Sequence, residues 1–303
     1  MKSYRLFAGV AAISLGFMLS GCGGDGGLAS TPPPPSYQTL KQIAAAGGDH
    51  SFATSGIQET FDSSGNPGNL VSRPLGSGVT IAYTASNNSY TVTAPEGNSA
   101  VFTPAELVAN PPGYAGSATY SSPTSFNRLI LLPASVNGVA LSYTMMGGWI
   151  YQNAAGNTVS EQATGGVPTI ASDMPRSGTA TYAVAVSADI STPTDVYQAA
   201  PGTSKSSFSV DFGAGTVATT INLTGTSYSQ VGTANAPTTD FGTFSGTGAI
   251  KSGTAGFSGT FAGTTASLFT GNFNGPQAAE MGYNFAFTTP SMSAIGQVVG
   301  KKN

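Results

Sequence analysis

The chain of 303 residues has little charge and almost none of the side chains that hold metals. It contains one cysteine, Cys22, and one histidine, His50, which excludes a disulfide framework, a thiolate cluster and a site of several histidines. Charged residues make up 8% of the chain, against about 25% in ordinary globular proteins. The ten basic residues form no patch in the sequence that could neutralise a phosphate backbone, so we expect no nucleic-acid partner.

Residues 1–21 have the features of a secretory signal peptide. Lys2 and Arg5 precede an apolar run from Leu6 to Leu19, which is shorter than the roughly 20 residues that a membrane-spanning helix needs. The run ends in Leu-Ser-Gly-Cys at residues 19–22, which resembles the lipobox of bacterial lipoproteins. That resemblance implies cleavage before Cys22, lipidation of Cys22 and, because residue 23 is not Asp, anchoring in the outer membrane.

The mature chain divides into three predicted parts. Residues 22–36 are rich in glycine and proline and predict a lipidated tether without packed structure. Residues 37–171 combine long polar loops with short alternating runs, which predicts a β-rich domain. Its candidate helix covers 40–46, and its candidate strands cover 78–85, 89–94, 128–132, 141–146 and 148–153.

Residues 172–303 contain alternating runs at a regular spacing. They cover 178–189, 205–212, 216–224, 240–250, 254–263, 266–274, 279–288 and 293–299. In the clearest run, Phe208, Val210 and Phe212 share one face. Eight antiparallel strands with one apolar face can close into a barrel, and the many phenylalanines predict a filled interior. The predicted fold is all-β, with an N-terminal β-rich domain followed by an eight-stranded antiparallel β-barrel.

One segment of the predicted barrel, FTGNFNGPQAAEMG at residues 269–282, resembles the signature of the transferrin-binding protein B β-barrel family. The signature joins a glycine turn to the opening of the next strand, here Gly275, Pro276, Ala279, Glu280, Met281 and Gly282. The resemblance covers about 172–303, and a looser one over 40–165 implies the handle domain of that family. It therefore implies a single-lobe, solute-binding lipoprotein at the cell surface.

The same resemblance implies the partners. Some relatives bind iron carriers, haem carriers or complement regulators, and some require an outer-membrane translocator. We therefore expect an extracellular protein or an iron or haem carrier as ligand, with an outer-membrane receptor or translocator as a further partner. Recognition is expected in handle loops near 62–76 and 108–126, and in barrel loops near 189–204 and 226–240. With so few charges, affinity would come from a few buried aromatic side chains.

Five aromatic residues are candidates for contact with the ligand: Tyr114, Trp149, Tyr151, Tyr197 and Tyr228. Trp149 and Tyr151 lie close in sequence to Met145 and Met146. Such a cluster is typical of core packing, and it also occurs at exposed interfaces. The sequence leaves both interpretations open.

The sequence indicates no catalytic residue, no cofactor and no metal site. His50 is best interpreted as a polar loop residue, with a haem ligand as the alternative, and no Gly-x-Ser-x-Gly motif accompanies it. Glu280 stands beside a turn, which favours a structural hydrogen bond over catalysis. We therefore expect a non-catalytic binding protein. A structural surface lipoprotein or adhesin without a specific solute is the alternative, and a secreted-type hydrolase is a remote one.

Overall fold

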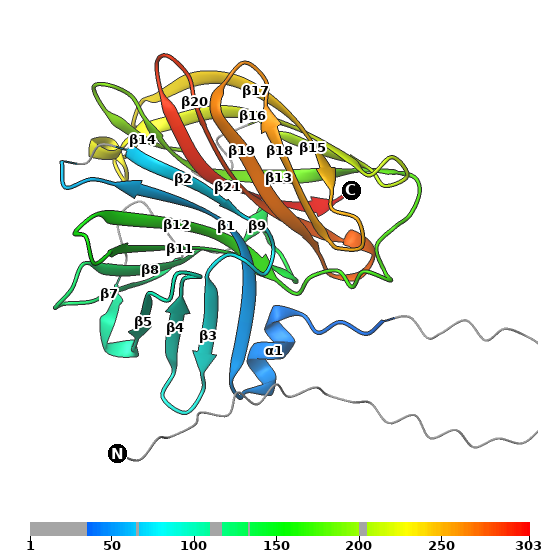
Figure 1. Ribbon diagram of the computed structural model, residues 1–303, viewed down its shortest axis with the longest axis horizontal. Helices are drawn as coiled ribbons and strands as arrows, with labels where there is room; N and C mark the ends of the chain where they lie inside the picture. The colour runs from blue at the N-terminus through cyan, green and yellow to red at the C-terminus, as the bar shows by residue number, and fades with distance from the viewer. Residues whose placement is uncertain (1–34, 65–66, 110–116, 133, 200–204) are drawn as a thin grey trace, which may run out of the picture. The chain divides into compact units, whose positions relative to one another are not determined.

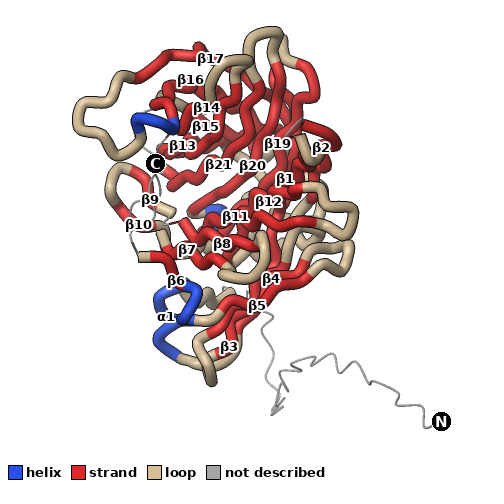
Figure 2. The backbone as a smooth tube through the Cα atoms, turned by 90° about the vertical axis from the view of Figure 1, so that its left-hand side faces the viewer, coloured by secondary structure: helices blue, strands red, loops and turns tan. Residues whose placement is uncertain are grey.

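The computed structural model describes residues 35–64, 67–109, 117–132, 134–199 and 205–303. Figure 2 shows that strands make up most of the regular structure in this part of the chain. Residues 35–303 form one compact unit that contains two large antiparallel sheets. The predicted all-β fold, a β-rich N-terminal region followed by an eight-stranded barrel, is confirmed.

The first sheet, here called the handle sheet, has ten strands. Its order is β5-β4-β3-β1-β12-β11-β8-β7-β6, and β2 pairs with β1 (Figure 1). The strands are β1 His50–Phe61, β2 Pro67–Arg73, β3 Thr80–Thr84, β4 Ser89–Thr93, β5 Ser99–Phe102, β6 Leu107–Val108, β7 Ala118–Ser121, β8 Asn127–Leu132, β11 Thr144–Gln152 and β12 Thr158–Gly166.

Short elements complete this half of the chain. The predicted helix at 40–46 is present as α1 Leu40–Ala46, and Thr39 and Gln42 form a capping box at its N-terminus. A 3-10 turn, η1 Pro104–Glu106, joins β5 to β6, and the hairpin of β9 Ser135–Val136 and β10 Val139–Ala140 precedes β11.

The handle sheet curls until strands far apart in its order meet. Tyr90 of β4 lies 5.5 Å from Tyr120 of β7, measured between ring centroids, and Phe102 of β5 lies 6.4 Å from Tyr120. The concave side encloses a core that includes Phe102, Leu129 and Trp149. The other side of β1, β12 and β11 is thereby left to face the second sheet.

The second sheet closes into a barrel. Its strands are β13 Thr179–Ser191, β15 Ser207–Asp211, β16 Thr216–Ser227, β17 Thr238–Ile250, β18 Gly256–Phe261, β19 Thr265–Asn274, β20 Glu280–Thr288 and β21 Ser293–Lys302. Closure is made by β13 and β21, which pair from Tyr182↔Lys302 to Ser191↔Ser293. A ninth, short strand, β14 Val196–Ala199, pairs with β13 and β16. The 3-10 turns are η2 Tyr228–Gln230 and η3 Pro276–Ala278.

Aromatic rings fill the barrel, as the sequence predicts. Phe269, Phe273, Tyr283 and Phe285 are each at most 1% exposed. The Phe273 ring lies 5.0 Å from that of Phe257, measured between centroids. Each ring buries apolar area, and tilted contacts between rings add about 0.5–1.5 kcal/mol per pair. The interior of the barrel is therefore a packed core.

Four sequence predictions need correction. The segments 62–76, 108–126 and 189–204, expected as loops, contain the strands β2, β7 and β14. The two strands expected at 141–146 and 148–153 form one strand, β11. The glycine pair inside β11 explains this last error, because it resembles a turn in sequence. In the structure Gly147 lets β8 approach closely, since a Cβ there would lie 3.1 Å from the Ile130 carbonyl oxygen.

Candidate functional site

Strand register places several handle turns at one end of the handle sheet. Phe61 at the end of β1 pairs with Thr158, and Tyr151 near the end of β11 pairs with Asn127 at the start of β8. The β1–β2 turn, the β7–β8 turn and the β11–β12 turn therefore lie at the same end. The described residues of these turns are 62–64, 122–126 and 153–157.

Barrel turns gather in the same way. Ser191 pairs with Ser293, Thr288 also pairs with Ser293, and Tyr197 pairs with Ser227. The turns 192–195, 228–237 and 289–292 therefore share one end of the barrel. Glu59 near the end of β1 lies close enough to Asp189 near the end of β13 for the charge of Asp189 to raise its pKa. The handle turns and the barrel turns therefore lie on the same side of the folded unit. We call these six turns together the loop end.

The loop end carries exposed apolar and aromatic side chains. Phe126 of the β7–β8 turn is 56% exposed, Val196 is 40% exposed and Tyr228 is 39% exposed. The Tyr228 hydroxyl donates a hydrogen bond of 2.7 Å to an Asp189 carboxylate oxygen, which fixes the ring against the barrel. Aromatic side chains held in place at a surface are typical of protein interfaces.

The five aromatic candidates from the sequence separate in the structure. Tyr197 and Tyr228 belong to the loop end, where the Tyr197 ring packs edge-on against another ring at 4.9 Å. Trp149 and Tyr151 are 1% and 3% exposed and stack with centroids 4.0 Å apart inside the handle core. Core packing therefore explains that cluster, and neither ring is available at the surface. Tyr114 lies outside the described residues.

Phe126 was not among the candidates. Its surroundings, SSPTSFNR at 121–128, have no alternation, and a single phenylalanine in a polar segment carries no signal of its own. Only the register of β7 and β8 shows that it stands at a turn beside the other loops.

Two glutamates of the handle sheet have perturbed acidities. Burial, and then the charge of Asp189, raises the pKa of Glu59 to about 7. Burial raises the pKa of Glu161 to about 7, although Arg73 and a 2.7 Å hydrogen bond from Gln58 oppose that shift. Adjacent strand residues point to opposite faces, so Gln58 and Glu161 lie on the concave side while Glu59 faces the barrel. Glu59 and Glu161 therefore lie on opposite faces of the handle sheet and do not form a catalytic pair.

The Glu161 carboxylate belongs to an ion cluster. The Arg73 guanidinium contacts Glu96 and lies 3.9 Å from Glu161, and Asn98 donates to the Tyr151 hydroxyl at 3.4 Å. The cluster ties β2 and the β4–β5 turn to β12. Its role is therefore structural: it holds β2, the strand that follows the β1–β2 turn.

The family motif lies at the opposite end of the barrel, in the turn between β19 and β20. Glu280 accepts hydrogen bonds of 2.7 and 2.8 Å from the backbone N–H groups of Ser142 and Tyr143, as expected for a structural rather than a catalytic role. Gly275 has φ +70°, and a Cβ there would collide with the Tyr143 ring. The motif thus joins the barrel to the chain that enters β11.

The start of the described chain is held at this same end. The Tyr37 hydroxyl donates to an Asp173 carboxylate oxygen at 2.8 Å, and the backbone N–H of Gln277 donates to the same oxygen at 2.9 Å. Burial acts to raise the pKa of Asp173, but the hydrogen bonds from Gln277 and Tyr37 outweigh it and lower that pKa. The described part of the chain therefore begins beside the motif, at the end opposite the loop end.

A layer of buried amides joins the handle sheet to the barrel. Asn284 donates to the Ser55 carbonyl oxygen and to Thr164, each at 3.0 Å. Gln297 donates to the carbonyl oxygens of Gly147 and Ala163 at 2.9 and 2.6 Å. These bonds give the buried amide N–H groups acceptors on the handle strands, so they fix one arrangement of the two sheets.

Other site types find no support in the described residues. His50 lies at the start of β1 with a ring nitrogen 3.1 Å from the Gly47 carbonyl oxygen. No group of three or more His, Cys, Asp or Glu side chains that could hold a metal ion occurs in the described part of the chain. The helices among those residues include none that is long and apolar enough to cross a membrane.

Comparison with known proteins agrees with the class that the fold defines, a closed barrel joined to a curled handle sheet. Residues 174–302 match the family model for the C-lobe and N-lobe beta barrels of Tf-binding protein B. The barrel of this chain is therefore similar to the β-barrels of transferrin-binding protein B, as the motif at 269–282 predicts. No curated protein sequence matches the chain.

Solved structures resemble it more distantly. A transferrin-binding protein B mutant from Haemophilus parasuis Hp5 is 15% identical with a TM-score of 0.41, over 74% of this chain and 53% of its own. This chain thus spans about half the length of that relative. The haemoglobin receptor HpuA from Kingella denitrificans, solved in complex with human haemoglobin, is 16% identical with a TM-score of 0.42, over 89% of this chain and 95% of its own.

Proposed function

We propose that this protein is a lipoprotein of the outer membrane that captures an extracellular protein at the cell surface, without catalysis. Lipidation of Cys22 and the tether of residues 22–36 would attach it to the membrane. The ligand would be an iron or haem carrier, in keeping with transferrin and haemoglobin as the partners named for the similar proteins. An outer-membrane receptor or translocator remains the second expected partner.

One observation supports the proposal: the loop end and the start of the described chain, near Tyr37, lie at opposite ends of the folded unit. The loop end unites turns of the handle sheet and of the barrel, whereas Tyr37 is fixed beside the motif at the other end. A tether leaving near Tyr37 directs the loop end away from the bilayer. Phe126, Val196 and Tyr228 then form the surface that meets a protein in the medium.

The proposal predicts that capture depends on Phe126. Immobilised residues 23–303 should retain a serum protein in a saturable way, and Phe126→Ser should weaken its binding about 10- to 100-fold, the usual loss when an aromatic anchor is removed. Val139→Ser is the matched control. Val139 is 53% exposed, close to the 56% of Phe126, and lies on the β9–β10 hairpin near the motif. The control should bind within twofold of the original protein.

Two outcomes would contradict this function. Absence of saturable binding would favour a structural surface lipoprotein or adhesin. An equal loss of affinity in Phe126→Ser and Val139→Ser would show that capture does not use the loop end. Protease treatment of intact cells tests the location separately, because a surface lipoprotein is cleaved while periplasmic proteins stay intact.

A further inference from the structure

The few basic residues of this chain are unevenly placed in the fold. Of ten, Lys2 and Arg5 belong to the leader, which leaves eight in the described residues. Four of these eight, Arg176, Lys251, Lys301 and Lys302, belong to the turns and strand end at the motif end of the barrel. They are far apart in sequence, so no basic run announces them.

Backbone hydrogen bonds show that these segments form one continuous rim. The N–H of Phe212 donates to the Gly178 carbonyl oxygen at 2.9 Å, which joins the turn after Arg176 to the β15–β16 turn. The N–H of Ile250 donates to the Gly215 carbonyl oxygen at 2.8 Å, which joins that turn to the one containing Lys251.

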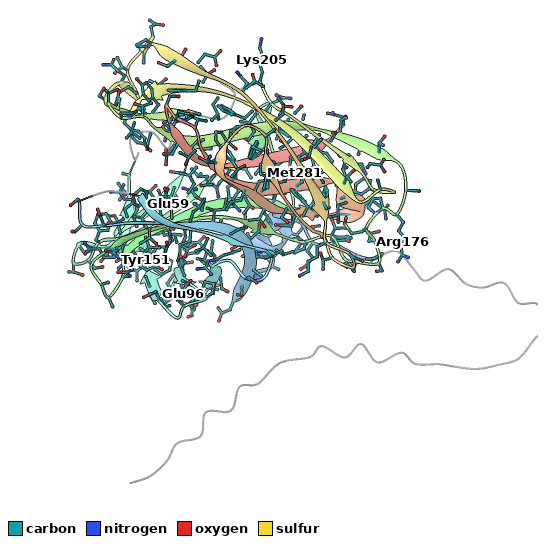
Figure 3. All side chains as sticks on the ribbon, turned by 45° about the horizontal axis from the view of Figure 1, so that its top comes forward. Glu59, Glu96, Tyr151, Arg176, Lys205 and Met281 are labelled. Atoms are coloured by element: carbon teal, nitrogen blue, oxygen red, sulfur yellow. The ribbon has the colours of Figure 1, made fainter. Side chains whose placement is uncertain are left out.

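The rim continues through the motif to the end of β21. The N–H of Phe273 donates to the Ala255 carbonyl oxygen, and the N–H of Lys302 donates to the Ala279 carbonyl oxygen, each at 2.9 Å. Arg176, Lys251 and Lys301 are exposed. Arg176 lies at the opposite side of the molecule from Glu59 of the handle sheet (Figure 3).

The acids near this rim are engaged in internal hydrogen bonds. Asp173 accepts from Tyr37 and Gln277, Asp211 accepts from the backbone N–H of Ala214 at 2.9 Å, and Glu280 accepts from two handle N–H groups. None of these bonds joins an acid to the four basic side chains. The rim therefore has four basic groups against three carboxylates. Its side chains Arg176, Lys251 and Lys301 are exposed, whereas the acids Asp173 and Glu280 are buried behind them.

Lys302 has a fixed place within the rim. Its ammonium donates to the Gln277 carbonyl oxygen at 3.0 Å and lies 5.3 Å from the centre of the Phe212 ring. Burial lowers the pKa of this lysine. Lys302 thus helps to shape the rim, while the other three cations point charge outward.

We propose that this basic rim, Arg176, Lys251 and Lys301 with Lys302 beside them, binds the anionic phosphate headgroups of the membrane to which the chain is tethered. The inference rests on the proposed function, because it takes the tether to leave near Tyr37. Charge complementarity supports it: anionic lipid headgroups attract clustered basic side chains within a Debye length of roughly 8 Å. The acids Asp62, Asp195 and Asp240 of the loop-end side are repelled by the same surface, so the rim turns the loop end outward.

Vesicle binding tests the rim without needing the lipid anchor or a ligand. Unacylated residues 23–303 should sediment with vesicles of phosphatidylethanolamine and phosphatidylglycerol, not with vesicles of phosphatidylcholine alone, and less as salt rises. Each basic residue near an anionic surface contributes about fivefold in affinity, the equivalent of roughly 1 kcal/mol. Arg176→Gln with Lys251→Gln should therefore weaken binding about 25-fold.

The control has the same net charge. Arg128→Gln with Lys205→Gln removes two exposed basic residues away from the rim and should change vesicle binding less than twofold. An equal loss of vesicle binding in the two double variants would overturn the proposal. Vesicle binding that does not depend on phosphatidylglycerol would overturn it too. The outcome is separable from ligand capture, because the rim variant should retain a serum protein in solution as well as the original chain does.

Discussion

The barrel and the handle sheet bury their cores in different ways. The described barrel core consists of apolar and aromatic side chains, with the hydroxyls of Tyr182 and Tyr283 as its only titratable groups. The handle core contains a similar aromatic cluster, yet beside it lie the Arg73 guanidinium and the Glu161 carboxylate. A closed sheet has no edge to satisfy, whereas a curled open sheet must hold its outlying strands by side-chain contacts.

This difference has a consequence for function. The barrel wall is fixed by its own closure, so its loops can vary without loss of the scaffold. The handle strands β2 and β5 depend on polar contacts, and the amide layer between the sheets holds the loops of both at one end. Stability is therefore expected to come mainly from the barrel, and sensitivity to pH mainly from the handle side.

The largest effect is expected from Phe273→Ala in the barrel. Phe273 is fully buried, and its ring contacts those of Tyr182, Phe208, Phe212 and Phe257. Removing it leaves a cavity that should lower the free energy of unfolding by about 3–5 kcal/mol. Urea denaturation followed by Trp149 fluorescence measures this change. A loss below about 1 kcal/mol would show that the barrel interior is not packed as described.

Glu280→Ala should uncouple the unfolding of the handle sheet from that of the barrel. It leaves the N–H groups of Ser142 and Tyr143 without their acceptor, at a cost of about 2–4 kcal/mol. Because the contact joins barrel to handle, we expect Trp149 fluorescence of the handle to change at a lower urea concentration than the far-ultraviolet signal of the whole chain. A single transition as stable as that of the original protein would mean that the motif is not the junction.

The third and smallest effect is expected from Glu59→Gln, which should change how the free energy of unfolding depends on pH. The pKa of Glu59 is about 7 in the folded protein and 4.5 as its ordinary value. A carboxyl whose pKa is raised by folding stabilises most below its unfolded pKa, and that stability is lost as pH rises to about 7. Stability should therefore fall between about pH 4.5 and 7, and Glu59→Gln should remove roughly 2 kcal/mol of that fall. An unchanged fall in the Glu59→Gln variant would contradict this assignment.

Much of the barrel could be predicted from the sequence, because alternation is preserved in strands that have one solvent-exposed face. β15, with Phe208, and β16 show this directly. The handle strand β1 escaped prediction for the converse reason. Its two faces meet the handle core and the barrel, and polar residues such as Ser55 and Gln58 are buried or bonded there.

The candidate site was predictable only in part. Glycine and proline marked the turn at Gly275, and the tyrosines at 197 and 228 stood near predicted loops. Nothing local indicates that Asn284 and Gln297 are buried, because an amide in a strand has the same pattern whether it meets water or a second sheet. The gathering of four basic residues at one rim also depends on register alone.

Hydrogen exchange on residues 23–303, measured with and without the captured serum protein, tests the central claim most directly. The account predicts that binding slows exchange in 122–126, 192–195 and 228–237, and leaves 251–255 and 275–279 unchanged. Slowed exchange confined to 251–255 and 275–279 would contradict it, because the ligand would then occupy the end that holds the tether.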